Sequence, residues 1–129
     1  MLMAISIGWI PISRAKELYW LKEDLASTSD PVVVFVHQRL EGTGGHTVKN
    51  ATQVRQILQE SKRVLAVFQG HYHAGHYSHL DGIHYYTLKS VVDGSGAENN
   101  SYAIVEVLDD YSLVVTGYRR AEDRKLVKA

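Results

Sequence analysis

The segment Val64–Tyr77, VLAVFQGHYHAGHY, constrains the fold of this chain more than any other feature. A short apolar run stops at Gly70, and His71 and His73 follow with one residue between them. An apolar run of this length that ends at a glycine is typical of a buried strand. In extended backbone, side chains two residues apart point to the same side. If the chain stays extended here, the two imidazoles offer their nitrogens to a metal ion on one side.

Two helices and a first strand are expected before this segment. Ser13 is a plausible helix N-cap, and the helix after it should place Leu18, Leu21 and Leu25 on one face. That helix should end within residues 27–30, where a turn signal precedes a proline. The next apolar run, PVVVFVH over residues 31–37, has the pattern of a strand buried on both faces.

A second helix is expected over Asn50–Ser61, where Asn50 and Gln53 have the spacing of a capping box. The loop QRLEGTGGHTVK precedes this helix. Further strands are expected at residues 64–68 and 83–88, and an antiparallel hairpin at residues 102–108 and 113–118. The charged residues 119–129 are expected to be frayed or to form a short helix.

This order of elements predicts an α/β fold, a layered sandwich, as one domain over residues 1–129. A helix between the strands that end at His37 and near His71 predicts a right-handed crossover and parallel pairing. His37, His71 and His73 would then emerge at the carboxyl edge of the sheet, where sites gather in open α/β sheets.

Composition limits the chemistry of such a site. The chain has 129 residues and no cysteine, so any metal must take nitrogen and oxygen ligands. Lys and Arg together number 14, as do Asp and Glu, and this balance gives no electrostatic sign of nucleic acid or membrane binding. The apolar start MLMAISIGWIPIS lacks the basic region of a signal peptide, so a cytoplasmic location is expected.

The chain resembles the C-terminal half of a calcineurin-like metallophosphoesterase. The resemblance rests on a buried strand that ends in His37, a helix, and a second strand that ends in the motif Gly70-His71-Tyr72-His73. Antiparallel strands follow the motif, as in the second sheet of that family. The resemblance implies the C-terminal half of a four-layer αββα sandwich with a two-metal site.

The resemblance also implies which residues bind metal. His37 and His71 would bind one ion, and His73 the other. Two such ions can clamp a phosphate and activate a bridging water. Histidine nitrogens in a mixed site suit Mn, Fe, Zn or Ni. No residue is assigned a catalytic role, and the sequence does not name the substrate.

The acidic motifs of the family's N-terminal half, Asp-x-His, Gly-Asp-x-x-Asp and Gly-Asn-His-Asp/Glu, do not occur in this sequence. Without carboxylates to offset their charge, two close metal ions would repel each other, so we expect one metal at most. The chain is therefore expected to be a partial domain: a truncated product, a product with a misplaced start, or one half of a split enzyme.

Four other histidines have simpler interpretations. His76 and His79 are expected in a loop, with a replacement ligand as the alternative, and His84 is expected to pack in a strand. His46 is expected to be a turn residue, although it could approach a substrate phosphate. His37 alone could also be an ordinary histidine at a strand end.

Two functions remain open on the sequence. The first is a metal-dependent phosphoester hydrolase, inactive until an N-terminal half or a partner chain supplies carboxylates. The second is a non-catalytic metal-binding or assembly module derived from the same fold. Because half of a sandwich leaves apolar strands uncovered, we also expect self-association or a partner chain.

Overall fold

The computed structural model of the chain describes residues 1–7, 15–42, 44–45 and 47–129. The expected cap Ser13 and His46 lie outside these residues. Two helices, one short 3-10 helix and eight strands follow in this order: β1 (Met3–Ile7), α1 (Ala15–Ala26), β2 (Val32–Val36), α2 (Ala51–Ser61), β3 (Val64–Gln69), β4 (His76–Leu80), β5 (Ile83–Thr87), η1 (Ala97–Asn99), β6 (Tyr102–Val107), β7 (Leu113–Tyr118) and β8 (Arg124–Leu126).

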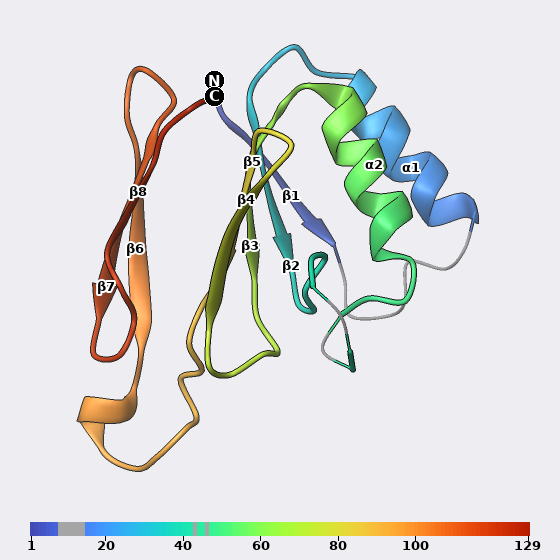
Figure 1. Cartoon of the computed structure of the whole chain (residues 1–129). Coiled ribbons are helices and arrows are strands. Elements are labelled where there is room, and N and C mark those ends of the chain that lie inside the picture. Colours follow the sequence, from blue (N-terminus) through green and yellow to red (C-terminus); the bar gives the residue numbers. More distant parts are fainter. Residues whose placement is uncertain (8–14, 43, 46) are drawn as a thin grey trace.

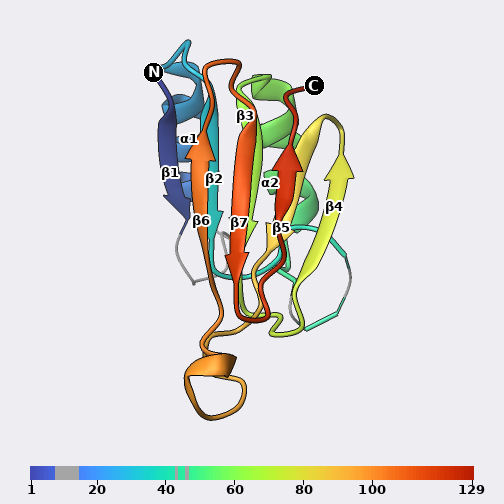
Figure 2. The ribbon, with the colours of Figure 1, turned by 90° about the vertical axis from the view of Figure 1, so that its left-hand side faces the viewer.

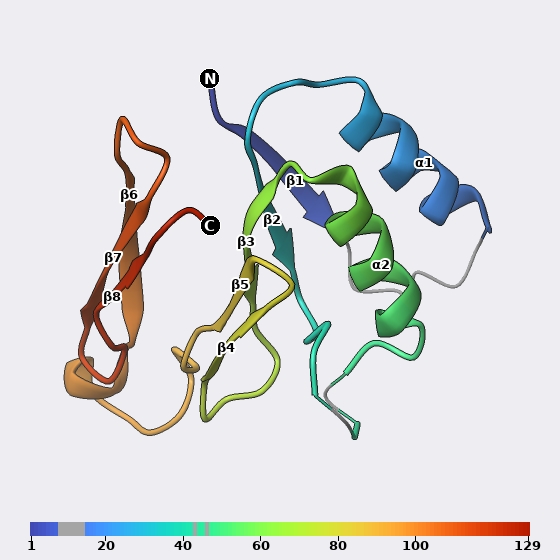
Figure 3. The ribbon, with the colours of Figure 1, turned by 45° about the horizontal axis from the view of Figure 1, so that its top comes forward.

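The elements form three layers (Figure 1). The central layer is a five-stranded sheet in the order β1-β2-β3-β5-β4, in which only β4 runs antiparallel to its neighbour. Helices α1 and α2 lie side by side on one face of it (Figure 3). The antiparallel sheet β6-β7-β8 covers the other face (Figure 2). The predicted layered α/β fold is confirmed.

The helices bury the apolar faces that the sequence predicts. Leu21 and Leu25 of α1, and Val54 and Leu58 of α2, are buried in one core with the helix-facing side chains of the sheet. Leu18 packs against this core. Helix α1 ends at Ala26, within one residue of the predicted stop.

A second core lies between the two sheets. It joins Val33, Phe68 and Tyr86 of the five-stranded sheet to Leu113 and Leu126 of the smaller sheet. Strand β3 is therefore buried along its whole length, as predicted. Strand β2 differs at one position, because Phe35 stacks on Phe68 at the rim and keeps 44% of its surface exposed.

The predicted hairpin is confirmed, because Tyr102 pairs with Tyr118 and Val107 with Leu113. The prediction for the last residues was wrong. They hold strand β8, antiparallel to β7, because Leu126 is buried opposite Leu113. The prediction of a loop at His76 and His79 was also wrong, since both lie in β4. Strand β1 was not predicted; it pairs with β2 in parallel.

Helix α2 begins after Asn50, as predicted, but the capping box is not formed. Asn50 has φ −103° and ψ 29°, outside the extended region that usually directs an N-cap side chain at the helix. Its side chain makes no capping hydrogen bond, and neither of its polar atoms has a partner within the described part of the chain. At the other end, Lys62 closes the helix in the left-handed conformation.

Candidate metal centre

Parallel strands β2 and β3 bring His37 and His71 to one edge of the sheet. His37 directly follows β2, and His71 comes two residues after β3. The Gly70 N–H donates to the His37 carbonyl oxygen at 3.0 Å, which ties the two strand ends together. A Cβ at position 70 would lie 3.3 Å from that oxygen, so glycine permits this close approach. The predicted convergence of His37 and His71 is what the fold produces.

The two imidazoles face each other. His37 Nε2 lies 3.2 Å from His71 Nδ1, and the ring planes meet at 61°. Two nitrogens on one tetrahedral zinc lie about 3.3 Å apart, since each Zn–N bond is about 2.0–2.1 Å long. At 3.2 Å the two nitrogens are within hydrogen-bond distance of each other, and the same spacing fits two ligands of a single metal ion.

His73 is held separately. Its Nδ1 lies 2.8 Å from Asp93 Oδ1, a residue in the connection between β5 and β6. A carboxylate that accepts a hydrogen bond from Nδ1–H leaves the lone pair of Nε2 for another partner, which is the usual support of a metal-binding histidine. The sequence pattern around His73 does not point to Asp93, because 20 residues separate the two.

The prediction of an extended backbone between His71 and His73 was wrong. His71 has φ 63°, in the left-handed region, and Tyr72 N–H donates back to Gly70 O at 2.7 Å. The chain therefore turns immediately after β3. Within the described residues, no three or more His, Asp or Glu side chains form a group arranged to hold a metal ion.

A buried polar network that was not predicted from the sequence lies next to the ends of β2 and β3. Gln69, the last residue of β3, donates through Nε2 to Glu41 Oε1 at 2.9 Å and to Thr87 Oγ1 at 3.0 Å. Arg39 binds both carboxylate oxygens of Glu41, at 3.1 and 2.7 Å. A glutamine at the end of an otherwise apolar strand was the available signal. The network fixes the loop after β2 to β3 and β5.

Glu41 in this network is ionised. Burial acts to raise the pKa of its carboxyl, but hydrogen bonds from Arg39 and Gln69, and the charge of Arg39, outweigh burial and lower the pKa below its ordinary value. His76 Nε2 lies 3.7 Å from Glu41 Oε2 and adds to the lowering when it is charged. The carboxylate is thus committed to neighbours inside the protein.

His84 packs in the sheet, as expected. It is buried. Its Nδ1 accepts a hydrogen bond from the Tyr77 hydroxyl at 2.7 Å, and its Nε2 donates one to the Val127 carbonyl oxygen at 2.8 Å. His79 stacks on it, with ring centroids 4.1 Å apart. Burial lowers the pKa of His84, so the neutral ring is the stable form. These two histidines are engaged with each other and with β4 and the C-terminal residues.

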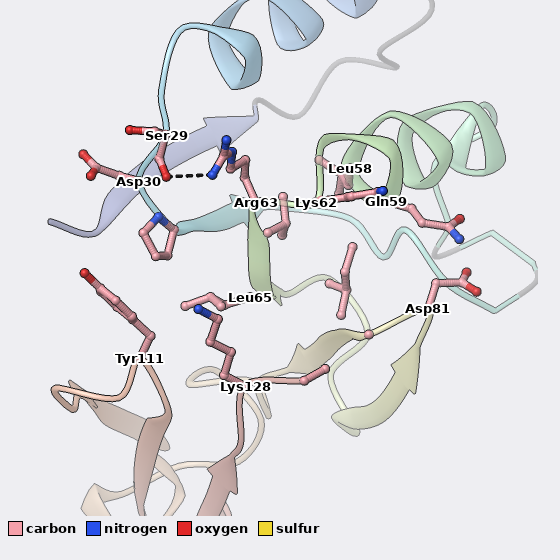
Figure 4. Close-up of a pocket in the computed structure, with 15 residues that line it drawn as sticks. Ser29, Asp30, Leu58, Gln59, Lys62, Arg63, Leu65, Asp81, Tyr111 and Lys128 are labelled. Carbon is pink, nitrogen blue, oxygen red and sulfur yellow. Dashed lines mark hydrogen bonds between the residues drawn. The ribbon is translucent and has the colours of Figure 1, made fainter.

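A pocket of about 490 Å³ lies at the other end of the molecule, by the start of β2 and β3 (Figure 4). Lys62, Arg63, Tyr111 and Lys128 line it, and Arg63 Nη1 donates to the Ser29 carbonyl at 2.8 Å. None of the histidines that the structure describes lines it. Its position separates it from the edge where His37 and His71 meet.

No family model matches the chain. A solved dimetal phosphatase from Danio rerio superposes on 90% of this chain with a TM-score of 0.78 and 22% sequence identity. The chain has a metallophosphoesterase-like fold. It covers 38% of the length of that phosphatase.

Two further proteins are similar to this chain. A probable cyclic nucleotide phosphodiesterase of Psychrobacter sp. (strain PRwf-1) is 29% identical over 80 residues, which are 58% of this chain and 24% of the relative. A conserved uncharacterized protein of Streptococcus pneumoniae TIGR4, described as a predicted phosphoesterase, aligns with 96% of this chain and 95% of its own at 14% identity and a TM-score of 0.42. Among the described helices, none is long and apolar enough to cross a membrane.

Proposed function

We propose that this chain supplies histidine ligands to the metal site of a phosphoester hydrolase. The observation that carries the proposal is the 3.2 Å approach of His37 Nε2 to His71 Nδ1 at the carboxyl edge of β2 and β3. Two proteins with which the chain shares its fold or part of its sequence are described as a dimetal phosphatase and a probable cyclic nucleotide phosphodiesterase. Both descriptions name phosphoester chemistry at metal ions or on nucleotides.

His37 and His71 would hold one ion between their facing nitrogens. His73 would bind through Nε2, because Asp93 keeps the proton on Nδ1. A metal bound there supplies Lewis acidity toward a phosphoryl oxygen and lowers the pKa of a bound water. Nitrogen ligands suit Mn, Fe, Zn or Ni.

The three histidines are neutral ligands, and the nearby buried carboxylate of Glu41 is bound to Arg39 and Gln69. We therefore expect the chain by itself to bind one metal ion and to hydrolyse phosphoesters slowly. Carboxylates from outside these 129 residues would be required to balance the charge of a two-metal site. Metal binding without turnover is the alternative function, and the engagement of Glu41 with Arg39 and Gln69 favours it, because that carboxylate is already bound inside the protein.

Metal titration paired with a hydrolysis assay separates the two functions. We expect Mn²⁺ or Zn²⁺ to bind at about one equivalent, and His37→Ala and His71→Ala each to lower the affinity by at least about tenfold. His79→Gln, on β4, is the matched control and should bind normally. Hydrolysis of p-nitrophenyl phosphate that needs the metal and is lost in His71→Ala would establish the hydrolase. Metal uptake without hydrolysis would establish the binding module, and affinity unchanged in His37→Ala and His71→Ala would refute the site.

A further inference from the structure

The edge strands on the two sides of this molecule differ in how well they are protected against pairing with another chain. On one side, β8 is only three residues long and carries Arg124 and Lys125, and β4 presents the exposed His76 and His79. Short strands and charged or polar side chains discourage pairing with another chain. On the other side lie β1 and β6, one from each sheet (Figure 2). Neither contains Pro, Lys or Arg.

Strand β6, YAIVEV, is the more open of these edges. Within the described residues it is bonded to β7 on one side alone. Ile104 is 51% exposed, Val105 38% and Val107 43%, and Glu106 is its one charged residue. A six-residue, largely apolar edge with a single charged residue is a template for a further strand.

The register of β6 assigns its side chains to two faces. Ala103 pairs with Gly117 and Val105 with Val115, and Val115 is buried between the sheets, so Ala103 and Val105 point inward. The alternate residues Tyr102, Ile104 and Glu106 therefore point outward. A strand that adds to this edge must keep the same faces in and out, because a slip of one residue would reverse them.

We propose that a second copy of the chain pairs with this edge, β6 against β6, about a two-fold axis at Ile104. Antiparallel pairing about such an axis places a residue opposite itself at the centre. Ile104 then faces Ile104 of the second copy, and Tyr102 faces its Glu106. Ala103 faces Val105 on the inner side. The result is one continuous six-stranded sheet.

Charge selects this axis over its neighbour. The Arg119 guanidinium lies 6.0 Å from the centroid of the Tyr102 ring, and Tyr102 stacks on Tyr118 at 4.7 Å. With the axis at Ile104, each Glu106 therefore lies beside Arg119 of the other copy. With the axis at Val105, Glu106 would face Ile104 instead. Complementary charges of this kind fix the register of an interface.

The pairing also shelters an open part of the core. Val105 and Ala103 line a groove of about 380 Å³ between the sheets, together with Phe35 and Phe68. In the proposed dimer, Val105 of the second copy lies next to Ala103 at the mouth of this groove. Burial of these apolar side chains stabilises the pair beyond the strand hydrogen bonds.

Sedimentation equilibrium with a charge swap tests the pairing. We expect a reversible dimer, weakened at least about tenfold by Glu106→Arg or by Arg119→Glu, and restored to within about threefold by the double swap. Glu23→Arg on α1 makes the same charge change on a helix and should leave the dimer unchanged. Circular dichroism verifies that each variant folds. A chain that stays monomeric at millimolar concentration overturns the proposal and leaves this edge to a different protein.

Disulfide trapping tests the register. The chain has no cysteine, so a single introduced thiol reports on itself. Ile104→Cys should form a covalent dimer rapidly on mild oxidation, because residues directly opposite have Cβ atoms about 4.5–5.5 Å apart. Glu106→Cys, two residues along the same face, should react much more slowly. Faster trapping of Glu106→Cys, or equal rates for both variants, contradicts the axis at Ile104.

Discussion

Asp93 is the residue that would direct a metal ion to Nε2 of His73, if His73 is a ligand as proposed. Its Oδ1 lies 2.8 Å from His73 Nδ1, and its backbone carbonyl accepts a hydrogen bond from Arg120 at 2.9 Å. The loop that carries Asp93 is thereby fixed to the end of β7. The tautomer of His73 depends on this arrangement.

If His73 joins His37 and His71 on the single ion expected for this chain, Asp93→Ala should weaken metal binding by about 10–100-fold, the usual effect of removing such a support. The reason is that His73 then loses the partner that orients its ring and holds its proton on Nδ1. Isothermal titration with Zn²⁺ measures the effect. Asp109→Ala, at the exposed turn of the β6–β7 hairpin, is the control. Equal affinities in both variants would show that His73 is not a ligand.

His84 gives the stability of the fold a pH dependence. Burial lowers its pKa below the ordinary 6.5, with His79 and Arg124 acting in the same direction and the Val127 hydrogen bond opposing them. The unfolded chain therefore binds a proton at a higher pH than the folded chain. Its contribution to stability is complete above pH 6.5 and declines as the pH falls through that value.

Urea unfolding measures this decline. We expect the free energy of unfolding to fall with a slope of up to about 1.4 kcal/mol per pH unit from this one group. His84→Phe should be less stable at neutral pH, because Tyr77 and Val127 lose their partner. Its slope below pH 6.5 should nevertheless be smaller than that of the wild type. An identical slope in both proteins would mean that His84 does not titrate on unfolding.

At the scale of elements, the Arg39–Glu41–Gln69 network joins the loop after β2 to the sheet. Glu41→Ala should destabilise the protein by about 3–5 kcal/mol, because Arg39 remains buried without its counterion. Arg39→Met with Glu41→Leu should cost less than the single change, since no unpaired charge is then left inside. Chemical denaturation compares the two. A double variant as unstable as Glu41→Ala would contradict this account of the loss.

Strand β8 closes the core between the sheets through Leu126, which is 1% exposed. Leu126→Ala should cost about 2–5 kcal/mol because it leaves a cavity against Leu113. Val127→Ala, whose side chain is 57% exposed, should change stability by less than about 0.5 kcal/mol. Thermal unfolding of both variants measures the difference. Similar melting temperatures for the two would contradict the packing role of Leu126.

The sequence predicts the elements whose patterns are long and strong. The leucines of α1, the apolar runs of β2 and β3, and the turn between β6 and β7 each carry a local signal. Strand β8 has three residues, two of them basic. It forms because Leu126 pairs with Leu113 of the neighbouring strand β7. Strand β4 is polar and forms by pairing with β5. These short elements depend on tertiary contacts that no local pattern contains.

The same division holds for the candidate site. The convergence of His37 and His71 follows from two parallel strands and the helix between them, so the sequence predicts it. The left-handed turn at His71 and the support from Asp93 do not follow, because they depend on a tight turn and on a loop 20 residues away. The burial of Glu41 could not be predicted either, because it lies in a loop that is buried only when the sheet forms.

The whole molecule is a sandwich of two sheets. The edge strands β4 and β8 on one side carry polar or basic residues, and the edge strand β6 on the other side is largely apolar. If β6 pairs with a second copy, folding is linked to association, and the unfolding midpoint must rise with protein concentration. Scanning calorimetry over a hundredfold concentration range should show this rise in the wild type and its loss in Glu106→Arg. A midpoint independent of concentration in the wild type would contradict pairing in the folded state.

The hydrogen bond from Gly70 to the His37 carbonyl has a consequence for how a metal ion would be acquired. The backbone, and not the ion, sets the separation of the two strand ends, so the proposed ligands His37 and His71 would be brought together when the sheet forms. The apoprotein is then a folded receptor, unlike a zinc finger, which folds only around its metal. Chelators should therefore strip the ion and leave the circular dichroism spectrum unchanged. Loading and unloading can follow the free metal concentration without a folding step in between.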